Sequence, residues 1–145
     1  FIMVNKVKRV LKNTAVFAAV MLLVSGGGAL SVKAARGVSH NFSFSLQYQG
    51  DTDRTPIVAK DTTDWCSMQC TWSEFPGASY YAYACDEEGR YASEKMVYFE
   101  QGTWALIGNS IKENGSDLCR IVAIGDYIPS DGCVFTGYWY ADSGF

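Results

Sequence analysis

The chain has 145 residues, of which 14% are aromatic, 12 are Lys or Arg, 15 are Asp or Glu and one is His. All 15 acidic residues follow position 50, whereas five of the 12 basic residues precede position 35. Residues 35–145 therefore have a net charge of about −8, with seven basic against 15 acidic residues. This charge disfavours binding to nucleic acid or to an anionic membrane surface.

Residues 1–34 have the three successive regions of a secretory signal peptide. Four basic residues lie between positions 6 and 12, an uncharged apolar run covers residues 15–24, and small residues suited to a peptidase follow up to Ala34. A permanent anchor is the disfavoured alternative, because a spanning helix needs about 20 apolar residues. We predict cleavage after Ala34, a single secreted extracellular domain over 35–145, and no stable membrane anchor after cleavage.

The rest of the chain contains short segments of strand character and no convincing helix. Residues 36–41 read as a short mobile segment, and residues 42–48 then alternate apolar and polar side chains, as a half-buried strand does. The predicted strands are 42–48, 66–72, 79–85, 95–99, 104–107, 118–124 and 133–140. Pro76-Gly77 and Asn114-Gly115 are turn signals, with a glycine that accepts positive φ. The pattern predicts an all-β fold, a small antiparallel β-sandwich or barrel.

All five cysteines follow the predicted leader, and bridges are their favoured state in an exported chain. They are Cys66, Cys70, Cys85, Cys119 and Cys133. Along one strand Cys66 and Cys70 lie roughly 13 Å apart, beyond the 4.4–6.8 Å typical of bridged Cα atoms. If the two strands around Pro76 form a hairpin, Cys66 faces Cys85, and the same argument pairs Cys119 with Cys133. Cys70 is then the free or intermolecular thiol, and metal ligation is a less favoured alternative.

No catalytic set can be assembled from the sequence. The single histidine, His40, lies in the segment expected to fray, which disfavours triad chemistry and a zinc site. Acidic residues at 51/53, 61/64 and 86–88 could supply the carboxylate pair of a glycosidase or the ligands of a calcium ion. Each group lies beside turn residues, however, and is expected to be solvated. We predict no catalytic residue, no cofactor and no metal.

Aromatic side chains are the other functional signal, because exposed Trp and Tyr stack on sugar rings or fill partner pockets. We expect most aromatic residues to pack in the core. Since neighbouring strand residues face opposite ways, Tyr138 and Tyr140 must point away from Trp139. The binding-surface candidates are Trp65, Trp72, Trp104, Tyr138, Trp139 and Tyr140.

Three features resemble a family of small secreted bacterial proteins related to exported, lactococcin-like bacteriocins. They are the Trp72 strand, the turn at 86–89 followed by Ser93, and the closing segment 137–142. The resemblance covers about residues 60–142 and implies a bacteriocin-associated interaction protein with no catalytic residues. Two hypotheses follow. The first is a secreted non-enzymatic binding protein with a cell-envelope or protein partner, and the alternative is a carbohydrate-binding module or carboxylate-dependent glycan enzyme.

Overall fold

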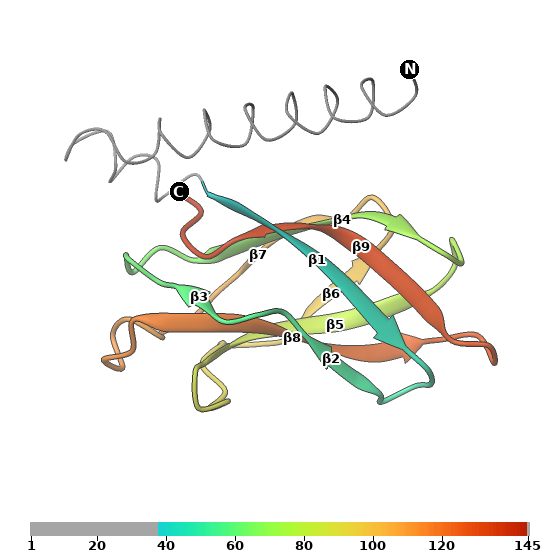
Figure 1. The fold of residues 1–145 in the computed structure, drawn as a ribbon, viewed down its shortest axis with the longest axis horizontal. Coiled ribbons are helices and arrows are strands. Elements are labelled where there is room, and N and C mark those ends of the chain that lie inside the picture. The colour runs from blue at the N-terminus through green and yellow to red at the C-terminus, as the bar shows by residue number, and fades with distance from the viewer. Residues whose placement is uncertain (1–37, 145) are drawn as a thin grey trace, which may run out of the picture. The chain divides into compact units, whose positions relative to one another are not determined.

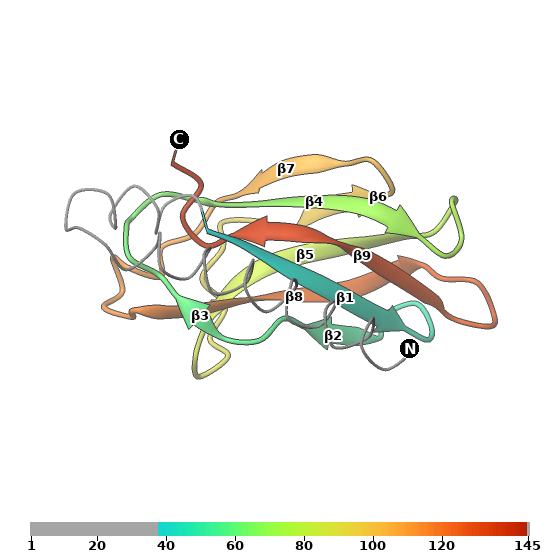
Figure 2. The same cartoon turned by 45° about the horizontal axis from the view of Figure 1, so that its top comes forward.

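A computed structural model describes residues 38–144, which belong to one compact unit (Figure 1). The predicted leader, 1–34, and its cleavage site lie outside the described residues. Within residues 38–144, nine antiparallel strands form two sheets, in the layered arrangement visible in Figure 2. Sheet A has the order β1 (Ser39–Leu46), β9 (Cys133–Tyr140), β4 (Cys66–Ser73) and β7 (Trp104–Ile107). Sheet B has the order β2 (Thr52–Arg54), β8 (Leu118–Tyr127), β5 (Ser79–Asp86) and β6 (Val97–Glu100), and β3 (Val58–Ala59) also pairs with β8. The chain is an all-β sandwich.

Seven of the strands match the alternating segments of the sequence. The bounds of β7 and β9 agree with the prediction, and β5 and β8 extend one and three residues further. β1 begins at Ser39, so the expected mobile segment 36–41 is wrong over Ser39–Asn41. His40 lies inside that strand, with its ring 5.4 Å from that of Trp139. The short strands β2 and β3 were not predicted, because a segment of two or three residues is too short to show an alternation of apolar and polar side chains.

The space between the sheets is filled by aromatic and aliphatic side chains. Tyr80 is fully buried at the centre, with ring centroids 4.8 Å from Phe135, 5.4 Å from Phe99 and 5.6 Å from Phe44. These three phenylalanines belong to different strands of both sheets, so one ring cluster joins the layers. Each buried aromatic side chain removes on the order of 150–250 Å² from water.

The chain crosses from sheet A to sheet B between β4 and β5. The turn at Pro76-Gly77 is present, with Ala78 N bonded to Phe75 O at 2.9 Å, but Gly77 is absent from the glycines with positive φ. The expected hairpin of these two strands is wrong, because β4 pairs with β7 and β9 whereas β5 pairs with β6 and β8. Because the chain changes sheets here, the apolar faces of β4 and β5 turn toward each other across the shared core.

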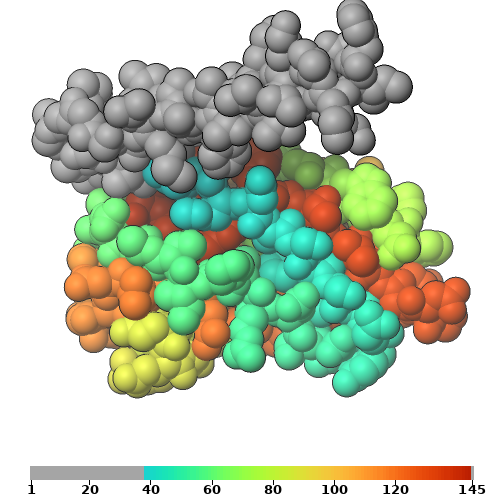
Figure 3. Space-filling model, viewed as in Figure 1, coloured from blue at the N-terminus to red at the C-terminus, as the bar shows by residue number. Residues whose placement is uncertain are grey.

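The edge of the sandwich turned to the viewer in Figure 3 is covered by β1 and by the segment that continues through β2 and β3. Two aspartates hold the connection between β1 and β2: Asp53 Oδ2 accepts a bond from Ser45 N and Asp51 Oδ2 one from Gln47 N, both at 2.8 Å. Among residues 38–144, no helix is long and apolar enough to cross a membrane.

Candidate functional site

The outer face of sheet A is lined by aromatic and uncharged polar side chains. One row crosses all four strands: Trp104 on β7 and Tyr138 on β9 flank Gln69 on β4, and Asn41 on β1 completes the row. Trp104 is 49% exposed, and the Tyr138 hydroxyl donates a hydrogen bond to Gln69 Oε1. Strands lie about 4.8 Å apart, so the two aromatic side chains start roughly 10 Å apart with an amide between them.

A second row runs beside the first. Leu106, Ser67, Tyr140 and Ser39 occupy it in strand order, from β7 to β1. The rings of Tyr138 and Tyr140 meet edge to face at 5.9 Å and 89°. The strand positions of both rows carry no acidic or basic residue. We call these two rows, together with Trp72, the aromatic face.

Trp72 joins the aromatic face because of a β-bulge. Alternation from Cys66, Met68 and Cys70 would turn residue 72 into the core, but the register of β4 against β9 shifts between Cys70 and Trp72. The extra residue reverses the alternation, so Trp72 is 48% exposed and Ser73 is buried. The bulge thus places Trp72, a predicted binding-surface candidate, on the exposed side of the sheet.

Gly137 allows β9 and β4 to approach closely beneath this face. A Cβ atom added at Gly137 would lie 1.9 Å from the backbone oxygen of Gln69 and 2.9 Å from the Phe42 ring. Any side chain here would push the two strands apart. The glycine thus fixes the distance between Gln69 and Tyr138, which form the middle of the first row.

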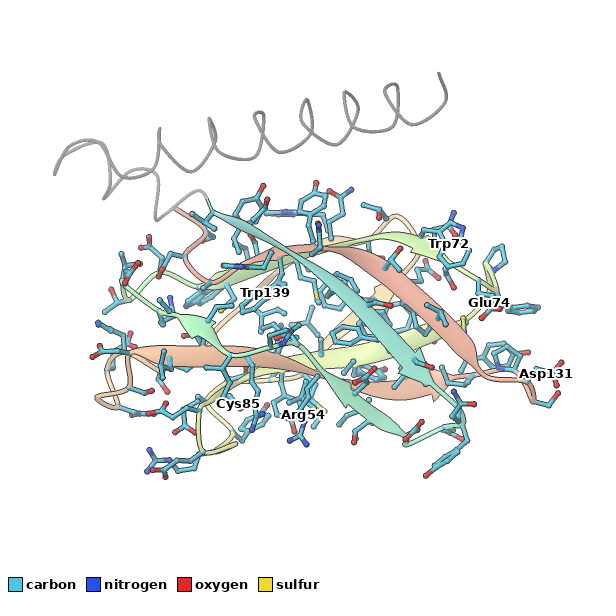
Figure 4. The ribbon with its side chains drawn as sticks, in the orientation of Figure 1. Arg54, Trp72, Glu74, Cys85, Asp131 and Trp139 are labelled. Atoms are coloured by element: carbon cyan, nitrogen blue, oxygen red, sulfur yellow. The ribbon has the colours of Figure 1, made fainter. Side chains whose placement is uncertain are left out.

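The remaining aromatic candidates divide between core and surface. Trp139 is fully buried between the sheets, as Figure 4 shows, so its proposed place on a binding surface is wrong. The alternation argument explains why: Trp139 points inward because its neighbours Tyr138 and Tyr140 point outward. Trp65 precedes β4 and is 44% exposed. An added Cβ at Gly108 would lie only 3.3 Å from the Trp65 ring, so the ring packs against this glycine.

The structure separates the cysteines that the sequence argument paired. All five are buried and free among the described residues. Cys85 belongs to the outer side of sheet B, where it lines a hollow, whereas Cys66 faces the core, so the hairpin basis for Cys66–Cys85 fails. Cys119 is the second residue of β8 and Cys133 the first of β9, and the length of β8 separates them by roughly 26 Å. Neither pair is brought together.

A buried ion pair at one end of the sandwich was missed by sequence reasoning. Lys60 Nζ lies 2.7 Å from Asp142 Oδ1, with side chains 0% and 1% exposed. Asp142 also accepts bonds from Asp61 N and from the Thr62 amide and hydroxyl. Burial alone would raise the pKa of Asp142, but the bonds from Lys60, Asp61 and Thr62 outweigh it and lower the pKa. A lysine that follows the apolar residues 57–59 was the one available signal.

The other acidic clusters have structural partners. Asp86 accepts bonds from Glu88 N, Arg90 N and Arg90 Nε. Burial opposes ionisation of Asp86, but these bonds prevail and lower its pKa. Such contacts close a turn. Among the described residues, no three His, Cys, Asp or Glu side chains form a group that could hold a metal ion.

The outer face of sheet B has a hollow of about 400 Å³ (Figure 4 labels Arg54 and Cys85 at its lining). Arg120 also lines it, and its Nε is buried without a hydrogen-bond partner among residues 38–144. Burial raises the pKa of Cys85, while its contact with Arg120 acts the other way. Guanidinium groups recognise carboxylate or phosphate oxygens. The unpartnered Arg120 Nε by itself does not define a binding site for such a group.

Comparison with known proteins gives one distant structural likeness. No protein-family model matches the chain, and no curated protein matches it. A solved structure of a family two carbohydrate esterase from Cellvibrio japonicus aligns with a TM-score of 0.36 and 12% identity. The alignment covers 70% of this chain and 33% of that chain, so this chain spans about a third of its length.

Proposed function

We propose that the protein is a secreted, non-enzymatic binding protein whose aromatic face binds an uncharged polysaccharide of a cell envelope. The observation that carries this proposal is the first row of sheet A, in which Trp104 and Tyr138 flank Gln69 and no strand position carries a charge. The proposal includes export through the predicted leader and a relationship to bacteriocin-associated proteins. The first comes from the signal-peptide pattern, and the second from the resemblance of residues 60–142.

The chemistry of a neutral sugar suits this face. A pyranose ring presents C–H groups on its flat sides, which pack on aromatic rings, and hydroxyl groups at its edge, which need hydrogen-bond donors and acceptors. Gln69, Asn41 and the serines of the second row supply such groups among the rings. Charged ligands would meet no countercharge at the strand positions of the two rows.

Binding is favoured over glycan hydrolysis because of the absence of acids on the face. A glycosidase needs two carboxyl groups on either side of the scissile bond, and no strand position of the two rows holds one. Among the described residues, Asp86 is engaged in a turn and Asp142 in the buried ion pair. A carbohydrate-binding module therefore accounts for the face better than a carboxylate-dependent enzyme.

The test is affinity electrophoresis of the purified protein in gels that contain β-glucan, xylan or mannan, all of them neutral polymers. We expect at least one of these polymers to retard the protein, and Trp104→Ala and Tyr138→Ala each to weaken binding about tenfold or more. Tyr98→Ala is the matched control, because Tyr98 is 42% exposed on the outer face of sheet B. Circular dichroism checks that each variant is folded.

Two outcomes would refute the proposal. One is the absence of retardation by every neutral polymer, which would leave a protein partner as the better hypothesis for the same face. The other is an equal loss in Trp104→Ala, Tyr138→Ala and Tyr98→Ala, because binding would then not depend on sheet A. Growth-inhibition assays on related strains test the bacteriocin relationship separately.

A further inference from the structure

Two buried cysteines meet across the core at one end of the sandwich. Cys66 opens β4 in sheet A and Cys119 lies at the start of β8 in sheet B. Both are 0% exposed and both belong to the same cluster of core side chains. Figure 2 shows that β4 and β8 belong to opposite layers. A bond between these two sulfurs would join the two sheets.

Independent contacts place the two residues at the same end. Lys60 N bonds Asp117 O, two residues before Cys119, and Lys60 Nζ reaches Asp142. The next residue, Ser143, bonds Trp65 O through its amide, and Trp65 precedes Cys66. The thiol of Cys66 also accepts a bond from Asn109 Nδ2 at 3.4 Å. Contact with Cys66, together with burial, raises the pKa of Cys119.

The other three cysteines have more distant relations to another cysteine: Cys70 interacts with Cys133, and Cys85 with Cys119, through charge alone and not through a hydrogen bond. Cys85 points to the outer side of sheet B beside Arg120. Cys70 and Cys133 lie on neighbouring strands, but Cys70 pairs with Gly137, four positions from Cys133. That offset is about 13 Å, well outside the 4.4–6.8 Å range of bridged Cα atoms. One bridge and three thiols therefore fit this fold, where the sequence argument favoured two bridges.

We propose that Cys66 and Cys119 form a disulfide that links sheet A to sheet B. The oxidant is a disulfide of low molecular weight, or that of a thiol–disulfide oxidoreductase. The thiolate of one cysteine attacks it and forms a mixed disulfide, with release of one thiol. The second cysteine, as thiolate, then attacks the sulfur of the first and displaces the other thiol. The protein loses two hydrogens and two electrons, and the oxidant gains them as two thiols.

The timing follows from burial. In the folded protein both thiols are inaccessible, and the raised pKa of Cys119 leaves little thiolate. Thiol–disulfide exchange must therefore occur during folding, before the two sheets have packed together. The cross-link encloses β4 to β8 in one covalent loop, which restricts the unfolded chain more than a short loop does. The inference is independent of what the aromatic face binds.

The experiment starts from the full chain, reduced and denatured, and refolds it with reduced and oxidised glutathione. The refolded protein is quenched in acid, and its free thiols are then alkylated with excess iodoacetamide in denaturant, because all five cysteines are buried in the folded protein. The product is analysed by mass spectrometry without reductant. We expect a protein that is two hydrogens lighter than the reduced chain before trapping, with three alkylated cysteines. Loss of the bridge in Cys66→Ala should lower the Tm by on the order of 10 °C.

The digestion must separate neighbouring cysteines. No Lys or Arg lies between residues 61 and 89, so trypsin leaves Cys66, Cys70 and Cys85 on one peptide. Chymotrypsin, which cleaves after Trp72 and Tyr83, separates Cys85 from the other two. The Cys70→Ser variant distinguishes Cys66 from Cys70, and it should still form the cross-link to the peptide that contains Cys119. Cys70→Ser is also the matched control for folding.

The results are decisive in either direction. A Cys66–Cys119 peptide in both the wild type and Cys70→Ser supports the proposal. If the variant fails to fold, fragmentation of the wild-type peptide that locates the alkyl group on Cys70 assigns the bridge to Cys66. Five alkylated thiols after refolding, or bridges that involve Cys85 or Cys133 instead, would overturn it. Polysaccharide binding by the refolded protein is scored separately, so loss of one inference leaves the other standing.

Discussion

Removal of one partner from the Lys60–Asp142 pair should destabilise the fold strongly. In Lys60→Met the Asp142 carboxylate keeps its bonds from Asp61 N and Thr62 but loses its countercharge. Its side chain is only 1% exposed, so water cannot replace the lysine. An uncompensated buried charge costs about 3–5 kcal/mol. Against a total stability of about 5–15 kcal/mol, this loss is a large fraction, so we expect the unfolding midpoint in urea to fall by more than 1 M, on the order of 2 M.

A double-mutant cycle isolates the pair itself. Lys60→Met combined with Asp142→Leu removes both charges, so the double variant should be more stable than the sum of the two single losses implies. Lys112 and Asp117 supply the matched control, because they form an ion pair in which Asp117 is 80% exposed. Lys112→Met should change stability by only about 0–1 kcal/mol.

The assay is urea denaturation followed by tryptophan fluorescence at neutral pH, with slopes compared to confirm two-state behaviour. The reasoning is refuted if Lys60→Met unfolds within about 1 kcal/mol of the wild type. It is equally refuted if Lys112→Met costs as much as Lys60→Met, because burial would then not set the penalty.

Three further predictions concern the close approach at Gly137, the pKa of Asp142 and the aromatic face. Gly137→Ala should lower the unfolding free energy by about 1–3 kcal/mol or more, measured by urea denaturation. Gly77→Ala should cost less, because Gly77 has no positive φ and its added Cβ would meet only the exposed Phe75 ring, at 3.2 Å. The bonds that lower the pKa of Asp142 stabilise the fold at pH values above its unfolded pKa of about 3.9. This stabilisation is lost as the pH falls through the folded pKa. In acid titrations, the unfolding free energy of Asp142→Asn should therefore fall less steeply with pH than that of the wild type. Polysaccharide binding should change little between about 0.05 and about 0.5 M NaCl, because the two rows carry no charge; a steep salt dependence in affinity electrophoresis would contradict this.

Much of the fold was readable from local pattern. Seven strands could be located because their side chains alternate, and the alternation in 133–140 correctly set Trp139 apart from Tyr138 and Tyr140. Alternation alone would not reproduce the exposed position of Trp72, because the bulge there is created by pairing between β4 and β9 and leaves no local trace in the periodicity. The exposed row of Trp104, Gln69 and Tyr138 comes from three strands far apart in sequence, so no local pattern could assemble it.

The sequence by itself determined the all-β class, the acidic character of residues 35–145 and the presence of a leader pattern, because each depends on composition or on short-range order. Only the tertiary structure decided which cysteines face one another, which tryptophans are exposed and how Lys60 meets Asp142. Those properties depend on which strands pair and on how two sheets stack, and the energy that selects them is shared among residues as far apart in sequence as Ser39 and Tyr140, which pair across 101 positions.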